Sequence, residues 1–224
     1  MGQPSRCSAI VFSRKRFRHY YRQRDELSEQ RRELPWVLVD KDYRFTDGFG
    51  EHSLLDLFGD CKQLMFYHFM YSPEWEQGCQ SCSYWADSFN GIDVHLAGRD
   101  IAFMAVSSAA IETLEKYKER LGWRFRWVSV SDSDFNRDFH VSFDAQCKEE
   151  GAIDYNYKKQ SFYMEELPGV SVFIRDESNR IFHTYSTYSR GVDILNAAYN
   201  YIDLSPLGRN EDNGQSWVRR NDEY

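Results

Sequence analysis

Hydrophobic and polar positions change their spacing several times along the chain, and each change marks an expected element. The apolar run KQLMFYHFMY at 62–71 is continuous rather than alternating, which predicts a central buried strand. Apolar residues at mostly helical spacing predict a helix over 83–98, just after two cysteines. Three elements follow in alternation: a strand at 101–107, a helix at 108–122 closed by Gly122, and a strand at 126–131.

Shorter patterns flank this central region. Before it, ELPWVLVDKDYRF at 33–45 and SLLDLF at 53–58 predict extended segments around the turn TDGFG. After it, GVSVFIRDESNRIFHTYST predicts a hairpin that turns at DESN, and GVDILNAAYNYI predicts a closing helix. Between about 132 and 168 the pattern weakens, and the many aromatic residues there predict a packed insertion rather than disorder.

The alternation of strands and helices indicates βαβ units with right-handed crossovers, and therefore an α/β sheet with flanking helices. We expect a basic helical arm at 1–33, an α/β domain at 34–210 and a polar C-terminal tail at 211–224. No helix or strand is predicted for the tail, which ends in WVRRNDEY.

Composition narrows the class of protein. The chain has 224 residues, of which 42% are hydrophobic and 17% aromatic, values typical of a folded globular protein. No run approaches the roughly 18 apolar residues that a membrane span needs. The N-terminal apolar stretch SAIVF is too short for the core of a signal peptide, so we expect a cytoplasmic protein.

Charge is unevenly distributed. Residues 1–32 hold nine Lys or Arg and three Asp or Glu, a net charge of about +6. Because the whole chain has a net charge of −7, the remaining residues carry about −13. A basic arm of this kind binds nucleic acid or an anionic surface in some proteins. The near-helical spacing of Phe17, Tyr20, Tyr21 and Leu27 favours an amphipathic helix folded onto the acidic body. We therefore expect neither nucleic acid nor a membrane as a partner.

Five cysteines contain one close pair, Cys79 and Cys82, in the stretch GCQSCSYWADSF. Their odd number and wide spacing differ from the dense disulfide framework of small secreted proteins. A lone CxxC in a reducing compartment points instead to catalysis or to metal binding. Cys7, Cys61 and Cys147 have no close partner in the sequence.

The position of the pair suits thiol-disulfide exchange. Residues i and i+3 in the first turn of a helix lie about 5–6 Å apart, within the range that a disulfide spans. The free N–H groups of that turn stabilise a thiolate on the first cysteine. We therefore predict that Cys79 is the nucleophile and Cys82 the resolving thiol of a dithiol-disulfide oxidoreductase that needs no cofactor.

Four other interpretations stay open. A structural zinc site needs four ligands, and Cys147 with one of His52, His68, His95, His140 or His183 would have to complete it. Two buried, inert thiols would also explain the pair. So would a metal-handling or purely interacting module that keeps the fold without turnover. The layout resembles that of thiol peroxidases as well. Counted from Pro73, however, Gln77 and Gln80 occupy the two positions where their signature has Thr or Ser and the reactive Cys.

Many short blocks also resemble, in the right order, those of one known family: LPWV, YRF, SLLDLF, QLMFYHFMY, GCQSCSYWADSFNG, SDFNRDFHVSF, GVSVFIRD, FHTYSTYSRG, NYIDLSPLGR and DEY. This is the thioredoxin-like domain of unknown function 899 family, described as predicted dithiol-disulfide oxidoreductases. The resemblance runs from about Glu33 to the C-terminus. It implies a thioredoxin-like fold of peroxiredoxin-type layout, a CxxC at Cys79 and Cys82, and a protein or small-molecule disulfide or thiol as partner.

Four further residues are candidates for substrate contact. Trp75 and Gly78 precede the first cysteine, where thioredoxins carry aromatic residues. Thioredoxin-like folds place a cis-proline before the strand that faces the disulfide, and Pro168, followed by Gly169, stands at that point. Packing accounts equally well for Trp75, and a plain loop proline for Pro168. His68 is a candidate acid or base, although a hydrogen-bonded core histidine is the favoured interpretation.

Overall fold

The computed structural model describes residues 6–144, 153–161 and 164–224, and the side chains from residue 14 onward. Contacts divide the chain into two units, Met1–Val37 and Leu38–Tyr224. The first unit consists largely of helix α1, Arg6–Arg32, which ends on two arginines where positive charge favours a helix terminus. That this helix folds onto an acidic body stays a prediction.

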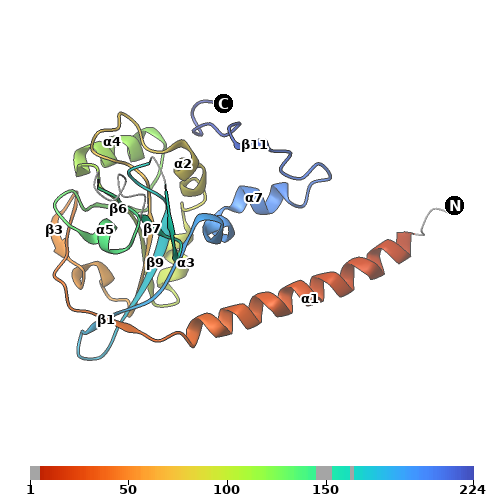
Figure 1. Ribbon diagram of the computed structural model, residues 1–224, viewed down its shortest axis with the longest axis horizontal. Helices are drawn as coiled ribbons and strands as arrows, with labels where there is room; N and C mark the ends of the chain where they lie inside the picture. The colour runs from red at the N-terminus through yellow and green to blue at the C-terminus, as the bar shows by residue number, and fades with distance from the viewer. Residues whose placement is uncertain (1–5, 145–152, 162–163) are drawn as a thin grey trace. The chain divides into compact units, whose positions relative to one another are not determined.

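Eight of the described strands form one sheet, in the order β1-β10-β9-β4-β5-β6-β2-β3. Figure 1 labels several of these strands on the ribbon. Their bounds are Val37–Val39 (β1), Arg44–Asp47 (β2), Gly50–Ser53 (β3), Gln63–His68 (β4), Ile101–Ser107 (β5), Arg126–Ser129 (β6), Gly169–Arg175 (β9) and Ile181–Tyr188 (β10). A separate hairpin joins β7, Ile153–Tyr155, to β8, Lys158–Gln160. A last short strand, β11, spans Asp212–Gln215.

The centre of the sheet has the predicted βαβ arrangement. Strands β4, β5 and β6 run parallel, with Tyr67 opposite Ala105 and Ala105 opposite Trp127. Strand β9 runs antiparallel to β4 and begins with Gly169 opposite His68. The predicted fold class is confirmed: this is an α/β protein, with helices on the faces of a mixed sheet.

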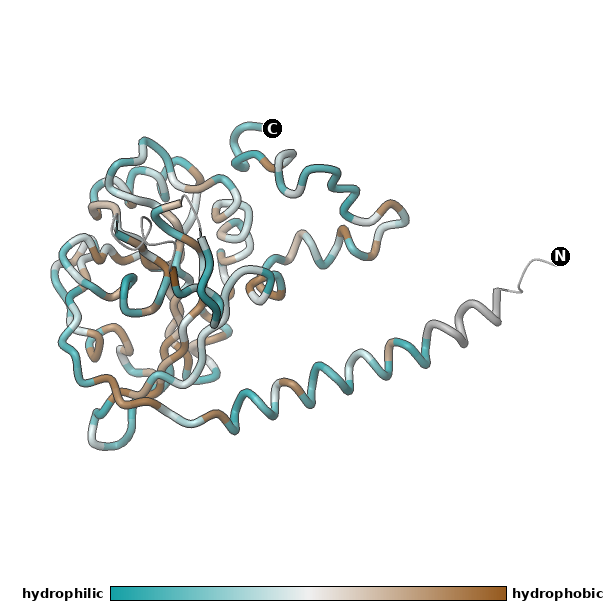
Figure 2. The backbone as a smooth tube through the Cα atoms, in the orientation of Figure 1, coloured by the Kyte–Doolittle hydropathy of each residue, from teal (hydrophilic) through white to brown (hydrophobic). Residues whose placement is uncertain are grey.

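Two aromatic cores enclose the central strands, because successive side chains of a strand point to opposite faces. Phe66 of β4 packs into one core with Phe45 and Phe135, whereas Tyr67 packs into the other with Trp85. Figure 2 shows hydrophobic residues concentrated in the folded body, and a mostly hydrophilic C-terminal segment. Both faces of the central strands are buried by the two cores, which explains the continuous apolar run of β4.

The segment SLLDLF is not extended, contrary to the prediction. It contains a single turn of 3₁₀ helix, η1, at Asp56–Phe58. The Asp56 carboxylate accepts hydrogen bonds from the N–H and the hydroxyl of Ser53, at 2.8 and 2.6 Å. The turn lets the adjacent Leu57 and Phe58 both bury their side chains, which an alternating strand would not allow.

Two helices predicted as continuous are each divided. The first forms α2, Gln80–Ala86, and α3, Ile92–Ala97, separated at Gly91 with φ 84°. The second forms a 3₁₀ helix η2, Ser189–Leu195, and α7, Ala197–Ile202, with the Asn196 side chain capping α7. Helix α4, Ile111–Arg120, is as predicted, and Gly122 with φ 70° ends it.

The insertion contributes to the core where it is described. Its short helix α5, Phe135–Asp138, buries Phe135 completely against β4. Cys147 lies outside the described residues. In the part of the chain that is described, no helix has the length and apolar character needed to cross a membrane.

We predict that Phe135→Ala lowers the free energy of unfolding by about 3–5 kcal/mol, because the ring is fully buried among other aromatic rings. Urea denaturation provides the measurement. Phe49→Ala is the matched control: this ring is 96% exposed at the β2–β3 turn, and its loss should change stability by less than about 0.5 kcal/mol. Equal effects of the two substitutions would contradict the assignment of the core.

Candidate active site

Strand β4 carries the chain to the cysteine pair. Beyond the end of this strand the backbone forms a loop that returns to Met70. The Cys79 N–H closes the loop by donating to the Met70 carbonyl at 3.0 Å. The Tyr71 hydroxyl donates to the Glu76 carbonyl at 3.1 Å across the same loop. The first cysteine is therefore held against the C-terminal end of the central strand.

Cys79 is the N-cap of α2, with φ −53° and ψ 127°. Its sulfur accepts a hydrogen bond from the Cys82 N–H at 3.5 Å. The hydrogen bond from the Cys82 thiol lowers the pKa of Cys79 to about 7, against the opposing effect of burial. The N–H groups of Cys82 and Ser81 and the charge of Arg220 act in the same direction. Near neutral pH a large fraction of this half-buried thiol is thiolate.

Cys82 has the opposite character. Its side chain is 2% exposed within the core beside Trp85. Burial, reinforced by the hydrogen bond to Cys79, raises the pKa of Cys82 well above its usual value. Both cysteines are free thiols in this structure. The pair thus consists of an accessible, acidic thiol and a buried, protonated one.

A cavity of about 220 Å³ opens beside the second cysteine. Cys82, Tyr67 and Trp85 line it from the core, and Pro168 lines it from the loop before β9. The described residues contain no cis peptide bond, so the bond before Pro168 is trans. The structure therefore places Pro168 next to the pair, in the trans isomer.

Gly78 and Gly169 both lie where a side chain would collide with aromatic rings. A Cβ at Gly78 would approach Phe69 to 2.8 Å and Tyr117 to 3.1 Å. A Cβ at Gly169 would approach Tyr188 to 2.8 Å. Gly78 is adjacent to the pair, whereas Gly169 lies in the sheet opposite His68. Packing therefore accounts for both glycines.

Trp75 lies in the loop before the cysteines. It is half-buried and packs against the same aromatic core as Cys79 and Cys82. Its backbone N–H donates to the Ser72 carbonyl at 3.0 Å, which closes a turn in the loop. The structure thus places Trp75 near the pair, as part of the loop packing.

His68 is a fully hydrogen-bonded core residue. Its Nδ1 lies 2.9 Å from Asn136 Oδ1, and its Nε2 lies 2.9 Å from Ser171 Oγ. Burial lowers the pKa of His68 to about 4, so the ring is neutral at pH 7. The ring stacks on Phe135, on the face of the sheet opposite Cys82.

The other zinc candidates are dispersed. His52 pairs with Asp47 at 2.8 Å, and His183 lies 2.7 Å from the Ser186 hydroxyl. Across 6–144, 153–161 and 164–224, no group of three or more His, Cys, Asp or Glu is arranged to hold a metal ion. Cys147, the other candidate ligand, lies outside these ranges.

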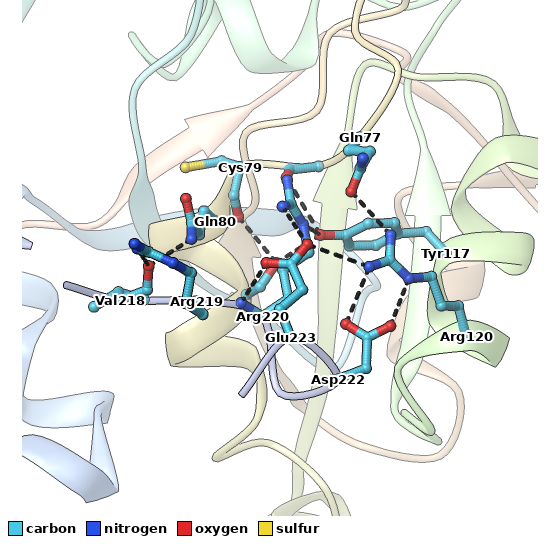
Figure 3. A network of polar contacts seen from close by, with 12 residues as sticks. Gln77, Cys79, Gln80, Tyr117, Arg120, Val218, Arg219, Arg220, Asp222 and Glu223 are labelled. Carbon is cyan, nitrogen blue, oxygen red and sulfur yellow. Dashed lines mark hydrogen bonds and ion pairs between the residues drawn. The ribbon is translucent and has the colours of Figure 1, made fainter. Parts of the chain in front are cut away.

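The C-terminal segment 216–224, to which the sequence pattern gave no role, reaches the cysteine loop (Figure 3). Arg220 donates from Nη2 to the Gly78 carbonyl at 2.9 Å and from Nε to the Tyr117 hydroxyl at 2.6 Å. The Gln80 side chain donates to the Val218 carbonyl. The only signal in the sequence is the charge-dense RRNDEY, which is equally typical of a solvated tail.

Comparison with known proteins identifies relatives of this chain. The family described as "Bacterial protein of unknown function (DUF899)" matches residues 14–224. Peroxidoxin BcpB from Mycobacterium tuberculosis is 14% identical with a TM-score of 0.47, over 75% of this chain and 96% of its own. Peroxiredoxin Q from Xanthomonas campestris is 15% identical with a TM-score of 0.47, over 74% and 93%. None of the curated proteins compared with the chain matches it.

We predict that Gly78→Ala lowers the free energy of unfolding by about 1–3 kcal/mol, because the new methyl group overpacks the aromatic rings around the loop. Urea denaturation measures the change. Gly48→Ala serves as the control, since its Cβ would meet open space. A Gly78 variant as stable as the control would contradict the packing described here.

We predict that iodoacetamide modifies Cys79 first in the reduced, folded protein, with a half-maximal rate near pH 7. The thiolate is the reactive species, so a lowered pKa shifts the rise in rate to lower pH. Burial raises the pKa of Cys61 and of Cys82, and both should react more slowly. Peptide mass spectrometry over pH 5–9 resolves each cysteine. Modification of Cys82 before Cys79 would contradict the assigned asymmetry.

Proposed function

The chain belongs to the DUF899 family of bacterial proteins, and we propose that it is a dithiol-disulfide oxidoreductase acting through Cys79 and Cys82. The observation that carries this proposal is the asymmetry of the pair. One thiol is half-buried with a pKa near 7, and its neighbour is buried and protonated. A structural role for two core thiols does not require them to differ in burial and pKa. Thiol-disulfide exchange does, because one sulfur attacks the substrate and the other resolves the mixed disulfide.

The reaction proceeds in two exchanges. The Cys79 thiolate attacks one sulfur of a disulfide RSSR′, so a Cys79–SR bond forms, the S–S bond breaks, and R′S⁻ leaves and takes up a proton. Cys82 then loses its proton and attacks Cys79 Sγ, which forms the Cys79–Cys82 disulfide and releases RSH. Two electrons pass from the protein to RSSR′, and two protons are taken up, one from Cys82 and one from solvent, which had received the proton that Cys79 lost on ionising. The reverse sequence oxidises a dithiol substrate.

Features around the pair support this order of attack. The hydrogen bonds to Cys79 Sγ stabilise it both as the attacking thiolate and as the leaving group in the reverse direction. The cavity beside Cys82 offers space for an apolar group of a bound substrate, next to Pro168. A protein or small-molecule disulfide therefore fits the site.

We predict that Cys82→Ser traps a mixed disulfide with an oxidised substrate, because the second exchange cannot occur. Oxidised glutathione and insulin are the probes, and mass spectrometry of the intact protein measures the adduct on Cys79. Cys79→Ser should form at least 10-fold less adduct, since Cys82 is buried and protonated. Cys61→Ser is the control and should behave like the wild type, because Cys61 does not contact the pair.

A redox titration of the wild type in glutathione buffers completes this test. A reversible two-electron transition between the dithiol and the Cys79–Cys82 disulfide is expected. Cysteines that never pair would overturn the proposed function. Pairing that requires prior removal of a bound metal would also overturn it. So would oxidation of the pair by hydrogen peroxide but by neither disulfide probe. The last result would assign the site to peroxide reduction.

A further inference from the structure

The C-terminal segment 216–224 is fastened to the protein beside the cysteine loop. Val218 is 1% exposed and belongs to the same aromatic core as Cys82. Arg120 of α4 binds Asp222 through two hydrogen bonds, at 2.7 and 3.0 Å. The same guanidinium donates to Gln77 of the cysteine loop at 2.9 Å. One arginine therefore joins the tail, the helix and the loop (Figure 3).

Arg220 lies closer to the reacting residues. Its side chain is 14% exposed and makes an ion pair with Glu223 at 3.0 Å. The guanidinium also donates to the Gly78 carbonyl and to the Tyr117 hydroxyl. Three partners in three directions suit the rigid, planar fork of an arginine.

Two hydroxyl groups extend this contact to Cys79 itself. The Tyr117 hydroxyl lies 2.9 Å from the Ser83 hydroxyl, which donates to the Cys79 carbonyl at 3.0 Å. Arg220 thus holds the carbonyl of the residue before the cysteine directly, and the cysteine's own carbonyl through two hydroxyls. Gly78 is buried, so losing Arg220 leaves its carbonyl only the Tyr117 hydroxyl, 3.3 Å away, whose single proton is shared with Ser83 Oγ at 2.9 Å.

We propose that Arg220 is a positioning residue for Cys79, and that the C-terminal segment thereby contributes this one residue to the active site. The inference deepens the proposed function and rests on it. Arg220 keeps the loop before Cys79 in one conformation, in which the Cys79 sulfur accepts a hydrogen bond from the N–H of Cys82. Its positive charge also favours the thiolate.

The test compares three full-length variants by the pH profile of Cys79 alkylation with iodoacetamide. In Arg220→Gln we expect the half-maximal rate to move from near pH 7 toward the value of a free cysteine, about 8.5. The rate at pH 7 should then fall about 3- to 10-fold, while the rate at pH 9 changes less than about 2-fold, since the thiolate fraction is high in both proteins.

Arg219→Gln is the matched control. It removes the same charge from the adjacent residue, whose guanidinium donates to the carbonyls of Ser216 and Val218 within the segment itself. Its alkylation profile should match that of the wild type. Arg220→Lys keeps the charge without the fork, so we expect it to restore only part of the rate at pH 7.

Two results would overturn the inference. The first is an Arg220→Gln variant that is folded by circular dichroism and keeps the wild-type profile. The second is an Arg220→Lys variant with the same alkylation profile as the wild type. That result would show that the positive charge at residue 220, and not its hydrogen bonds, lowers the pKa of Cys79. Alkylation needs no turnover, so these results are independent of trapping by Cys82→Ser. Failure to trap an adduct, with a shifted Arg220→Gln profile, would overturn the proposed function and leave the contact intact.

Discussion

The burial of strand β4 on both of its faces is the constraint on which the rest of the site depends. Phe66 and Tyr67 enter opposite aromatic cores, so both faces of the strand are packed and the strand cannot move without disturbing one of the cores. Its neighbours β5 and β9 fix it from both edges. Cys79 is hydrogen-bonded to Met70, just beyond the end of this strand, and therefore occupies a position that the whole sheet determines.

Different surroundings give the two thiols different chemistry, although only two residues separate them. Cys79 lies at the start of α2, where N–H groups point toward its sulfur and part of the side chain reaches solvent. Cys82 lies one turn further, beside Trp85 and Tyr67, where burial outweighs the hydrogen bonds from Met70 and Tyr67 that favour a thiolate. The helix sets the spacing of the pair, and the aromatic core sets the order in which the thiols ionise.

The C-terminal segment adds a contact that joins distant parts of the chain. Arg220 and Gly78 are 142 residues apart in sequence, yet the guanidinium is the closest polar partner of the Gly78 carbonyl. Arg120 binds Asp222 on the neighbouring surface, so opposite charges on α4 and on the tail hold the segment in place. A thiol site built at the end of a sheet strand thereby receives a cationic neighbour that the sheet itself does not supply.

The sequence by itself determined the elements whose pattern is local. The apolar run of β4, the alternation through β5, α4 and β6, and the hairpin of β9 and β10 follow from which faces are buried, and the CxxC was correctly expected at the start of a helix. Local pattern was insufficient where neighbours decided the outcome, at the η1 turn and at the break before α3. Only the tertiary structure showed that Pro168 lines the same cavity as Cys82, that Gly169 belongs to the packing, and that the tail reaches Gly78. Periodicity reports that a residue is buried or exposed, whereas contacts across more than a hundred residues depend on how the whole chain packs.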